Sequence, residues 1–75
     1  MIQLYTSDSC VWCRKMKQYL KSKNVDFEEL NVSDAKNAER VYSLSGQRAI
    51  PVTVIGNRVI VGFDTNAVDH ALAEE

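Results

Sequence analysis

The amino-acid sequence predicts an α/β fold of three layers, in which a mixed four-stranded sheet has helices on both faces. Apolar patterns along the 75 residues follow the order β-α-β-α-β-β-α. A helix of about a dozen residues joins the first two strands, so these strands must be parallel through a right-handed crossover. A two-residue turn joins the last two strands, which must therefore be antiparallel. A chain of this length predicts one domain, residues 1–75.

A buried strand and a basic helix open the chain. Residues 2–6 alternate between apolar and polar side chains, which is typical of a short strand. The polar residues 7–9 are of the type that caps the start of a helix. From residue 11 to about residue 23, one helical face carries the apolar side chains Cys13, Met16, Tyr19 and Leu20. Basic side chains take much of the opposite face.

Residues 25–32 predict the second strand, but their apolar side chains do not alternate strictly. The alternation slips between Glu29 and Leu30. A helical pattern follows over residues 35–45, and Gly46 is the type of residue that commonly ends a helix. This part of the chain therefore adds a strand and a helix to the first pair.

Two β-branched runs flank Gly56 and Asn57 and predict a hairpin within residues 52–61. The last helical pattern covers residues 65–72 and places its apolar side chains on one face. Together, the predicted helices on both faces of the sheet give enough core for so short a chain.

Composition excludes several classes of function. A net charge of −1 gives no electrostatic basis for binding nucleic acid or a membrane surface, and no apolar run approaches the roughly 20 residues that span a bilayer. The N-terminal segment lacks the basic and apolar regions of a secretory signal, so we expect the protein in the reducing cytoplasm. We also expect a monomer.

Cys10 and Cys13 are the only cysteines, and they form a C-x-x-C pair. A closed zinc site needs four ligands, and His70 is the only histidine that could join the pair, so we expect no metal site. Inert core cysteines are a second alternative. The third is a redox pair, which C-x-x-C indicates when it lies between a strand and a helix of a βαβ unit. The element order favours the redox pair because it places the motif at that junction.

The same junction gives the two sulfurs different roles. Cys10 lies where the helix begins, so unpaired backbone N–H groups and the helix dipole favour a thiolate there. Arg14 and Lys15 are close enough in sequence to add positive charge. Cys13 lies one turn further into the helix, where we expect it to be more buried. We therefore predict that Cys10 attacks a substrate disulfide and that Cys13 resolves the mixed disulfide.

Pro51 is the only proline, and it opens a run that would otherwise be a central strand. Proline donates no backbone hydrogen bond and is poorly tolerated inside a sheet. One interpretation is a trans peptide bond at the start of the strand. The other is a cis bond that exposes the backbone of Ile50 near the cysteines, and the predicted fold favours it.

The segments "YTSDSCVWC", "SGQRAIPV" and "VGFD" resemble, in content and order, those of a glutaredoxin-like protein of the thioredoxin superfamily. The resemblance covers residues 2–72. It implies the thioredoxin-like three-layer fold, a cis bond before Pro51 and thiol–disulfide oxidoreductase activity. It also implies that Ile50 and Pro51 face the cysteine pair and present backbone groups to the substrate. No bound cofactor is implied, and glutathione is a possible co-substrate.

Glutathione-using members of that family resemble the chain in part. They usually carry a lysine three residues before the first cysteine, where this chain has Ser7. Arg48 either compensates for that lysine or is an ordinary solvated arginine. Gly62 matches the second glycine of the G-G-C-x-D-like segment of these members. Thr65, or Asp64 after a shift of one residue, stands where an acidic residue grips the γ-glutamyl amine.

A second branch comprises small redoxins that serve ribonucleotide reductase and take electrons from thioredoxin reductase. They resemble the chain in C-V-x-C, in S-G-x-R before the proline, and in a G-F pair that matches Gly62 and Phe63. Their usual tryptophan-serine before the glycine and arginine-proline after the phenylalanine are absent here. The chain is intermediate between the two branches, so the resemblance leaves glutathione and thioredoxin reductase both open as the electron donor.

Trp12 lies inside the C-x-x-C motif, where it either contacts a partner or packs over the first helix. We interpret it as a substrate contact. The predicted function is reduction of disulfide-containing proteins or glutathione mixed disulfides by the Cys10–Cys13 pair, with electron transfer in cell redox homeostasis. The alternative is a carrier, a dimer that holds an iron–sulfur cluster through Cys10 of each chain.

Overall fold

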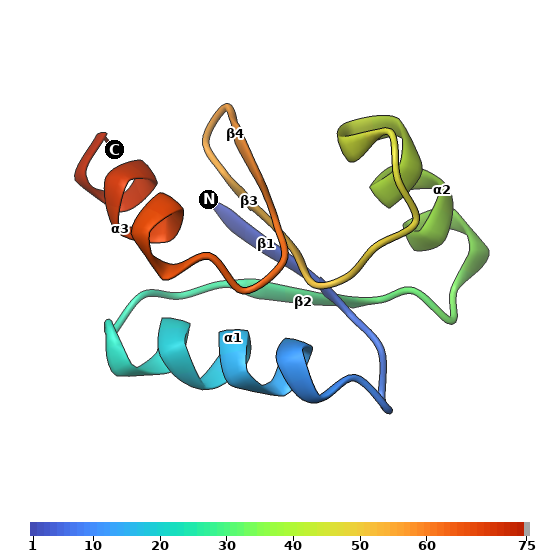
Figure 1. Ribbon diagram of the computed structural model, residues 1–75, viewed down its shortest axis with the longest axis horizontal. Coiled ribbons are helices and arrows are strands. Elements are labelled where there is room, and N and C mark those ends of the chain that lie inside the picture. The colour runs from blue at the N-terminus through green and yellow to red at the C-terminus, as the bar shows by residue number, and fades with distance from the viewer. Residues whose placement is uncertain (75) are drawn as a thin grey trace.

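The computed structural model describes residues 1–74 and has the predicted element order (Figure 1). Its strands are β1 (Ile2–Thr6), β2 (Glu28–Asn31), β3 (Val52–Ile55) and β4 (Arg58–Val61). Its helices are α1 (Val11–Ser22), α2 (Ala35–Ser45) and α3 (Thr65–Glu74). The four strands form a mixed sheet in the order β2-β1-β3-β4. No helix within residues 1–74 is long and apolar enough to cross a membrane.

The pairing of the strands confirms the topology that the connection lengths predict. β1 pairs in parallel with β2 on one side and antiparallel with β3 on the other. β3 and β4 form the antiparallel hairpin, which turns at Gly56 with a φ of +58°. A positive φ of this kind costs glycine least, because it has no Cβ. Two distant parts of the sequence therefore pair with β1, and the end of β1 lies beside the start of β3.

Helices cover both faces of the sheet, so the structure has three layers and two cores. β1 alternates between the two cores because successive side chains of a strand point to opposite faces. The residues of the core under α1 and α3 are Ile2, Leu4, Met16, Leu20, Ile55, Ile60, Val68 and Ala71. The residues of the core under α2 are Tyr5, Val41 and Val52, with Leu30, Val32, Leu44 and Val54 packed against them.

The second strand is shorter than the sequence pattern predicts. A strand over residues 25–32 is wrong at both ends, because β2 spans only Glu28–Asn31. The physical reason is the length of its neighbour. Gln3 pairs in parallel with Glu28, so residues 25 and 26 lie before the start of β1 and have no strand beside them with which to form ladder hydrogen bonds.

The slip in the alternation of β2 marks a change of core. Phe27 packs against the core under α1 and α3, whereas Leu30 packs against the core under α2. Glu29 pairs with Leu4, so its side chain faces α1 from a strand position where an apolar residue is usual. The pattern thus leaves one carboxylate between the sheet and α1.

The start of α1 also differs from the sequence pattern. The polar residues 7–9 do not cap the helix. The N-cap is Cys10, whose Sγ accepts a hydrogen bond from the backbone N–H of Cys13. The other helix ends follow the predicted chemistry more closely, since Gly46 ends α2 with a φ of +72°. α3 continues past Leu72 to Glu74.

Candidate active site

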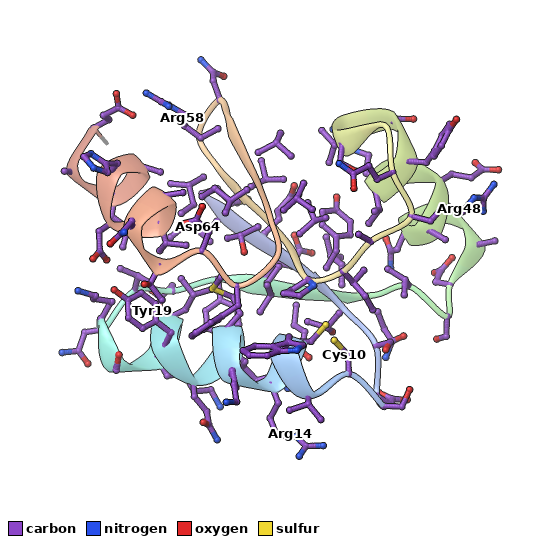
Figure 2. All side chains as sticks on the ribbon, viewed as in Figure 1. Cys10, Arg14, Tyr19, Arg48, Arg58 and Asp64 are labelled. Carbon is purple, nitrogen blue, oxygen red and sulfur yellow. The ribbon has the colours of Figure 1, made fainter. Side chains whose placement is uncertain are left out.

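The two cysteines lie where the sequence places them, between the end of β1 and the first turn of α1. Both thiols are free. Cys10 is half-buried at the N-terminal end of α1 (Figure 2), and Cys13 is 1% exposed. The expected difference in burial between the two sulfurs is therefore confirmed.

A backbone hydrogen bond distinguishes the sulfurs further. The Cys13 N–H lies 3.1 Å from Cys10 Sγ and donates to it. A donor aimed at a sulfur from the first turn of a helix stabilises negative charge on that sulfur. Burial raises the pKa of the Cys13 thiol to about 12, and the contact with the Cys10 side chain and the charge of Glu29 act in the same direction. Burial thus keeps the inner sulfur protonated, whereas the outer sulfur has a backbone donor aimed at it.

The two basic residues that follow the motif differ in their surroundings. Lys15 Nζ lies 4.8 Å from the centre of the Trp12 ring, in a cation–π contact. The side chain of Arg14 extends from α1 away from the sheet (Figure 2). Lys15 therefore contacts the Trp12 ring, and the contact made with Cys10 Sγ comes from the backbone donor.

An apolar groove at Trp12, within the C-x-x-C motif, brings together three segments that are far apart in sequence. It has a volume of about 290 Å³ and is lined by Trp12, Ile50, Pro51, Gly62 and Phe63. The peptide bond between Ile50 and Pro51 is cis, as expected. The Gly62 N–H donates a 2.8 Å hydrogen bond to the Pro51 carbonyl, which joins the segment after β4 to the start of β3. The groove therefore contains five of the predicted site residues.

Aromatic contacts fix the rim of this groove. The rings of Trp12 and Phe63 lie 5.8 Å apart, and Tyr19 meets Phe63 edge-on at 6.3 Å. The Tyr19 hydroxyl donates a hydrogen bond to Asp69 of α3, and Lys23 forms an ion pair with the same carboxylate. Trp12 remains 55% exposed and Phe63 38% exposed. The rim thus offers apolar surface to a partner.

The remaining predicted site residues have contacts of their own. Arg48 stacks over the Tyr42 ring at 5.4 Å, on the α2 side of the molecule (Figure 2). It lines a separate small cavity, which shares Ile50 with the groove. The Asp64 carboxylate accepts a hydrogen bond from the Ala67 N–H and so caps α3, whose first residue is Thr65. The structure therefore does not bring these three side chains into the groove.

Sequence reasoning missed a polar cavity at the cysteines. This cavity is about 120 Å³ in volume, and both Cys10 and Cys13 line it. The residues that complete its lining are Thr6, Ser7, Asp8, Arg14, Lys17 and Glu29. The slip of alternation beside Glu29 is the only sequence signal that could have indicated it. Within residues 1–74, no three His, Cys, Asp or Glu side chains gather as a metal site would need.

Comparison with known proteins identifies the family. The family model for glutaredoxin matches residues 2–60, which include the C-x-x-C motif and Pro51. The chain belongs to the glutaredoxin family. Its fold and its adjacent cysteines are those of a glutaredoxin-like redox protein, a family whose members are generally thiol–disulfide oxidoreductases.

Several proteins resemble this glutaredoxin-family chain over most of its length. An uncharacterised glutaredoxin-like 8.6 kDa protein in the rubredoxin operon of Clostridium pasteurianum is 47% identical over 73 residues, which are 96% of this chain and 97% of that protein. Glutaredoxin 3 of Escherichia coli is 33% identical over 64 residues, or 84% of this chain and 77% of that protein. The solved structure of NrdH-redoxin from Escherichia coli, described as a glutaredoxin-like protein with a thioredoxin-like activity profile, has a TM-score of 0.80 at 29% identity and covers 92% of this chain and 91% of that chain.

Proposed function

We propose that the protein is a dithiol oxidoreductase that reduces disulfides in other proteins. The observation that carries this proposal is the pair of unequal sulfurs. Cys10 is reachable from solvent and accepts the Cys13 N–H, whereas Cys13 is buried directly behind it. The Cys10–Cys13 disulfide must be reduced to the dithiol after each cycle, which needs a reducing compartment. We place the protein in the cytoplasm for that reason.

The mechanism follows from the positions of the two sulfurs. The Cys10 thiolate attacks one sulfur of a substrate disulfide, forms a mixed disulfide and releases the first substrate thiol. Cys13 then attacks Cys10 Sγ, and the second substrate thiol leaves. The substrate gains two electrons, and the protein is left with a Cys10–Cys13 disulfide. No bound cofactor takes part in the proposed reaction.

The apolar groove supports a polypeptide substrate. A cysteine disulfide in a protein is flanked by backbone and side chains that must lie beside the attacking sulfur. The groove offers the exposed rings of Trp12 and Phe63 together with the backbone around Ile50 and Pro51. Exposed aromatic residues at such a position are typical of protein contacts.

A protein reductase is the electron donor that the side-chain contacts support. Glutathione carries two carboxylates and needs cationic partners. Ser7 stands where the family's lysine would be, and Arg48 is stacked on Tyr42. The Asp64 carboxylate, a candidate to bind the glutathione amine, instead caps α3. We therefore propose that a flavoprotein reductase of the thioredoxin reductase type reduces the Cys10–Cys13 disulfide, with glutathione as the alternative donor.

Two assays that consume NADPH test both parts of this proposal on one disulfide substrate, insulin. One assay supplies thioredoxin reductase, and the other supplies glutathione with glutathione reductase. The reductase assay is expected to be faster by roughly tenfold or more, because a missing charge-assisted hydrogen bond to glutathione costs about 1.5–3 kcal/mol. A faster glutathione assay would reverse the choice of donor. The absence of reduction in both assays, and with dithiothreitol as donor, would contradict the proposed function itself.

The contact between Tyr19 and Phe63 predicts that the rim can be weakened without changing the chemistry. Tyr19→Phe keeps the ring but removes the hydroxyl that binds Asp69. We expect a roughly two- to tenfold higher KM for a protein disulfide, the range of one lost hydrogen bond, because the Tyr19 ring that contacts Phe63 is no longer anchored to Asp69. The rate with bis(2-hydroxyethyl) disulfide, which is too small to use the rim, should not change. Equal losses with both substrates would show that the substitution acts on the sulfurs.

A further inference from the structure

One charged side chain near the cysteines has no part in the mechanism given above. Glu29 lies on β2 at a position that faces α1, since it pairs with Leu4 of the α1 core. Two groups hold its carboxylate. Lys17 Nζ of α1 lies 2.9 Å from Glu29 Oε2, and the Thr6 hydroxyl donates to the same oxygen at 3.0 Å. The carboxylate is therefore fixed between the sheet and α1.

Glu29 is ionised at neutral pH, and its side chain is partly exposed to solvent. The ion pair with Lys17 holds the pKa of the Glu29 carboxyl below its usual value, and the Thr6 hydroxyl acts in the same direction. The side chain is 41% exposed, so a proton taken up there can pass to bulk solvent. An anion that exchanges protons freely can serve as a proton acceptor.

The polar cavity connects this carboxylate to the buried thiol. Cys13 and Glu29 both line it, and Cys13 and Lys17 are one turn apart on the same face of α1. A polar cavity of about 120 Å³ is large enough to hold several water molecules. Water in this space can bridge the thiol and the carboxylate where no direct contact is made.

The resolving step needs such an acceptor. Only a thiolate, or a thiol that loses its proton as it reacts, attacks a disulfide. Burial, the largest cause of the raised Cys13 pKa, does not depend on the state of Cys10 and keeps the Cys13 thiol protonated at neutral pH in the mixed disulfide as well. Free ionisation would therefore make resolution slow. The proton becomes strongly acidic as the new sulfur–sulfur bond forms, so even a carboxylate is a strong enough base at that moment.

We propose that Glu29 accepts, through water in the polar cavity, the proton that Cys13 releases when it resolves the mixed disulfide. The Cys13 S–H bond and the bond between Cys10 and the substrate sulfur break, and the Cys10–Cys13 bond forms. The substrate leaves as a thiolate with the electron pair of the broken disulfide bond, and the proton goes to Glu29 and then to solvent. The inference rests on the proposed dithiol mechanism and adds the proton transfer that it leaves open.

The other charged groups around the cavity are less suited to this role. Arg14, Lys17 and Lys21 are cations and cannot accept a proton at neutral pH. Asp8, in the loop before α1, is the second carboxylate of the lining, and its Oδ1 accepts a hydrogen bond from the side chain of Asn31 of β2. Glu29 is the carboxylate whose charge acts on the Cys13 thiol.

Glu29→Gln tests the proposal, because charge alone and proton acceptance predict opposite results. The amide oxygen can still accept hydrogen bonds from Thr6 and Lys17, so the site keeps its shape. If Glu29 acted only through its negative charge, its removal would lower the Cys13 pKa and make resolution faster. If Glu29 accepts the proton, resolution should slow by at least tenfold at pH 7, since general bases contribute about 10²–10⁴-fold and water can replace part of this.

The measurement is a single turnover of the reduced protein with bis(2-hydroxyethyl) disulfide, stopped with acid and followed by mass spectrometry. The mixed disulfide should accumulate in Glu29→Gln, and its decay should accelerate roughly tenfold per pH unit as hydroxide replaces the lost base. In the wild type the decay should change little between pH 6 and pH 8. The first step, measured in a Cys13→Ser background, should be the same with and without Glu29→Gln.

Glu28→Gln is the matched control, because Glu28 precedes Glu29 on β2 but points to the other face of the sheet. It should resolve at the wild-type rate. Resolution in Glu29→Gln that is as fast as in the wild type, or faster, would overturn the inference while leaving the dithiol mechanism intact. A wild-type protein that forms no mixed disulfide, together with a Cys13→Ser variant that traps none, would overturn the proposed function and this inference with it.

Discussion

Replacing Cys10 with serine is expected to abolish disulfide reduction while leaving the fold intact. Cys10 carries the reachable sulfur, and the only other cysteine in the sequence, Cys13, is 1% exposed. A hydroxyl is not a nucleophile toward a disulfide under these conditions, so we expect a loss of at least roughly 10³-fold in the rate of insulin reduction with dithiothreitol. Serine is a preferred N-cap residue, and at this position it can accept the Cys13 N–H as the sulfur does.

Helix stability and activity should therefore separate in Cys10→Ser. Circular dichroism and urea unfolding should show a protein at least as stable as the wild type, with no activity. Cys13→Ser is the informative partner variant, because it keeps the attacking sulfur and should accumulate a mixed disulfide with the substrate. Substantial reduction of insulin by Cys10→Ser would refute the assignment of the attacking sulfur.

Leu20→Ala is expected to remove a large part of the free energy of folding. Leu20 is fully buried in the core under α1 and α3. Truncation of a buried leucine to alanine costs about 2–5 kcal/mol, from lost transfer free energy and the cavity left behind. A chain of 75 residues has a total stability of roughly 4–11 kcal/mol. The variant should thus be partly unfolded, or unfold at a much lower urea concentration, in equilibrium denaturation followed by circular dichroism.

Val59→Ala provides the comparison at an exposed site. Val59 lies on the edge strand β4 and is 37% exposed, so its truncation should cost well under 1.5 kcal/mol. A Leu20→Ala protein with a urea midpoint close to that of Val59→Ala would show that this core collapses around the missing atoms. Such relaxation would contradict the rigid packing that the fully buried side chain indicates.

The order of elements could be predicted because it depends on residues that are neighbours in sequence. Gly46 ends α2 and Gly56 turns the hairpin through local backbone geometry, and both work as expected. The length of β2 depends instead on where β1 begins, which is a pairing over more than twenty positions of sequence. Local pattern therefore overestimated this strand. The cap of α1 was missed because a cysteine is rarely considered as an N-cap.

In the candidate site too, features set by neighbouring residues could be predicted and features set by distant contacts could not. The C-x-x-C spacing and the junction that holds it are local, so the unequal burial of the sulfurs was foreseeable. The family's sequence pattern indicated positions such as Arg48 and Asp64, but a position does not reveal what a side chain contacts. Arg48 stacks over the Tyr42 ring, and Asp64 caps the start of α3. Predicting that Glu29 faces α1 would have required the register between β1 and β2, which only the structure supplies.

The position of Trp12 has a practical consequence for studying this protein. It is the only tryptophan in the sequence. When the protein is excited at a wavelength that tryptophan absorbs and tyrosine does not, all of the fluorescence comes from this one ring. That place is inside the redox motif, with Lys15 over the ring and Phe63 beside it. Sulfur oxidation and the arrival of a partner both change the surroundings of this ring. The natural chain therefore carries an intrinsic fluorescent reporter, and its redox cycle can be followed in real time without a dye or a label.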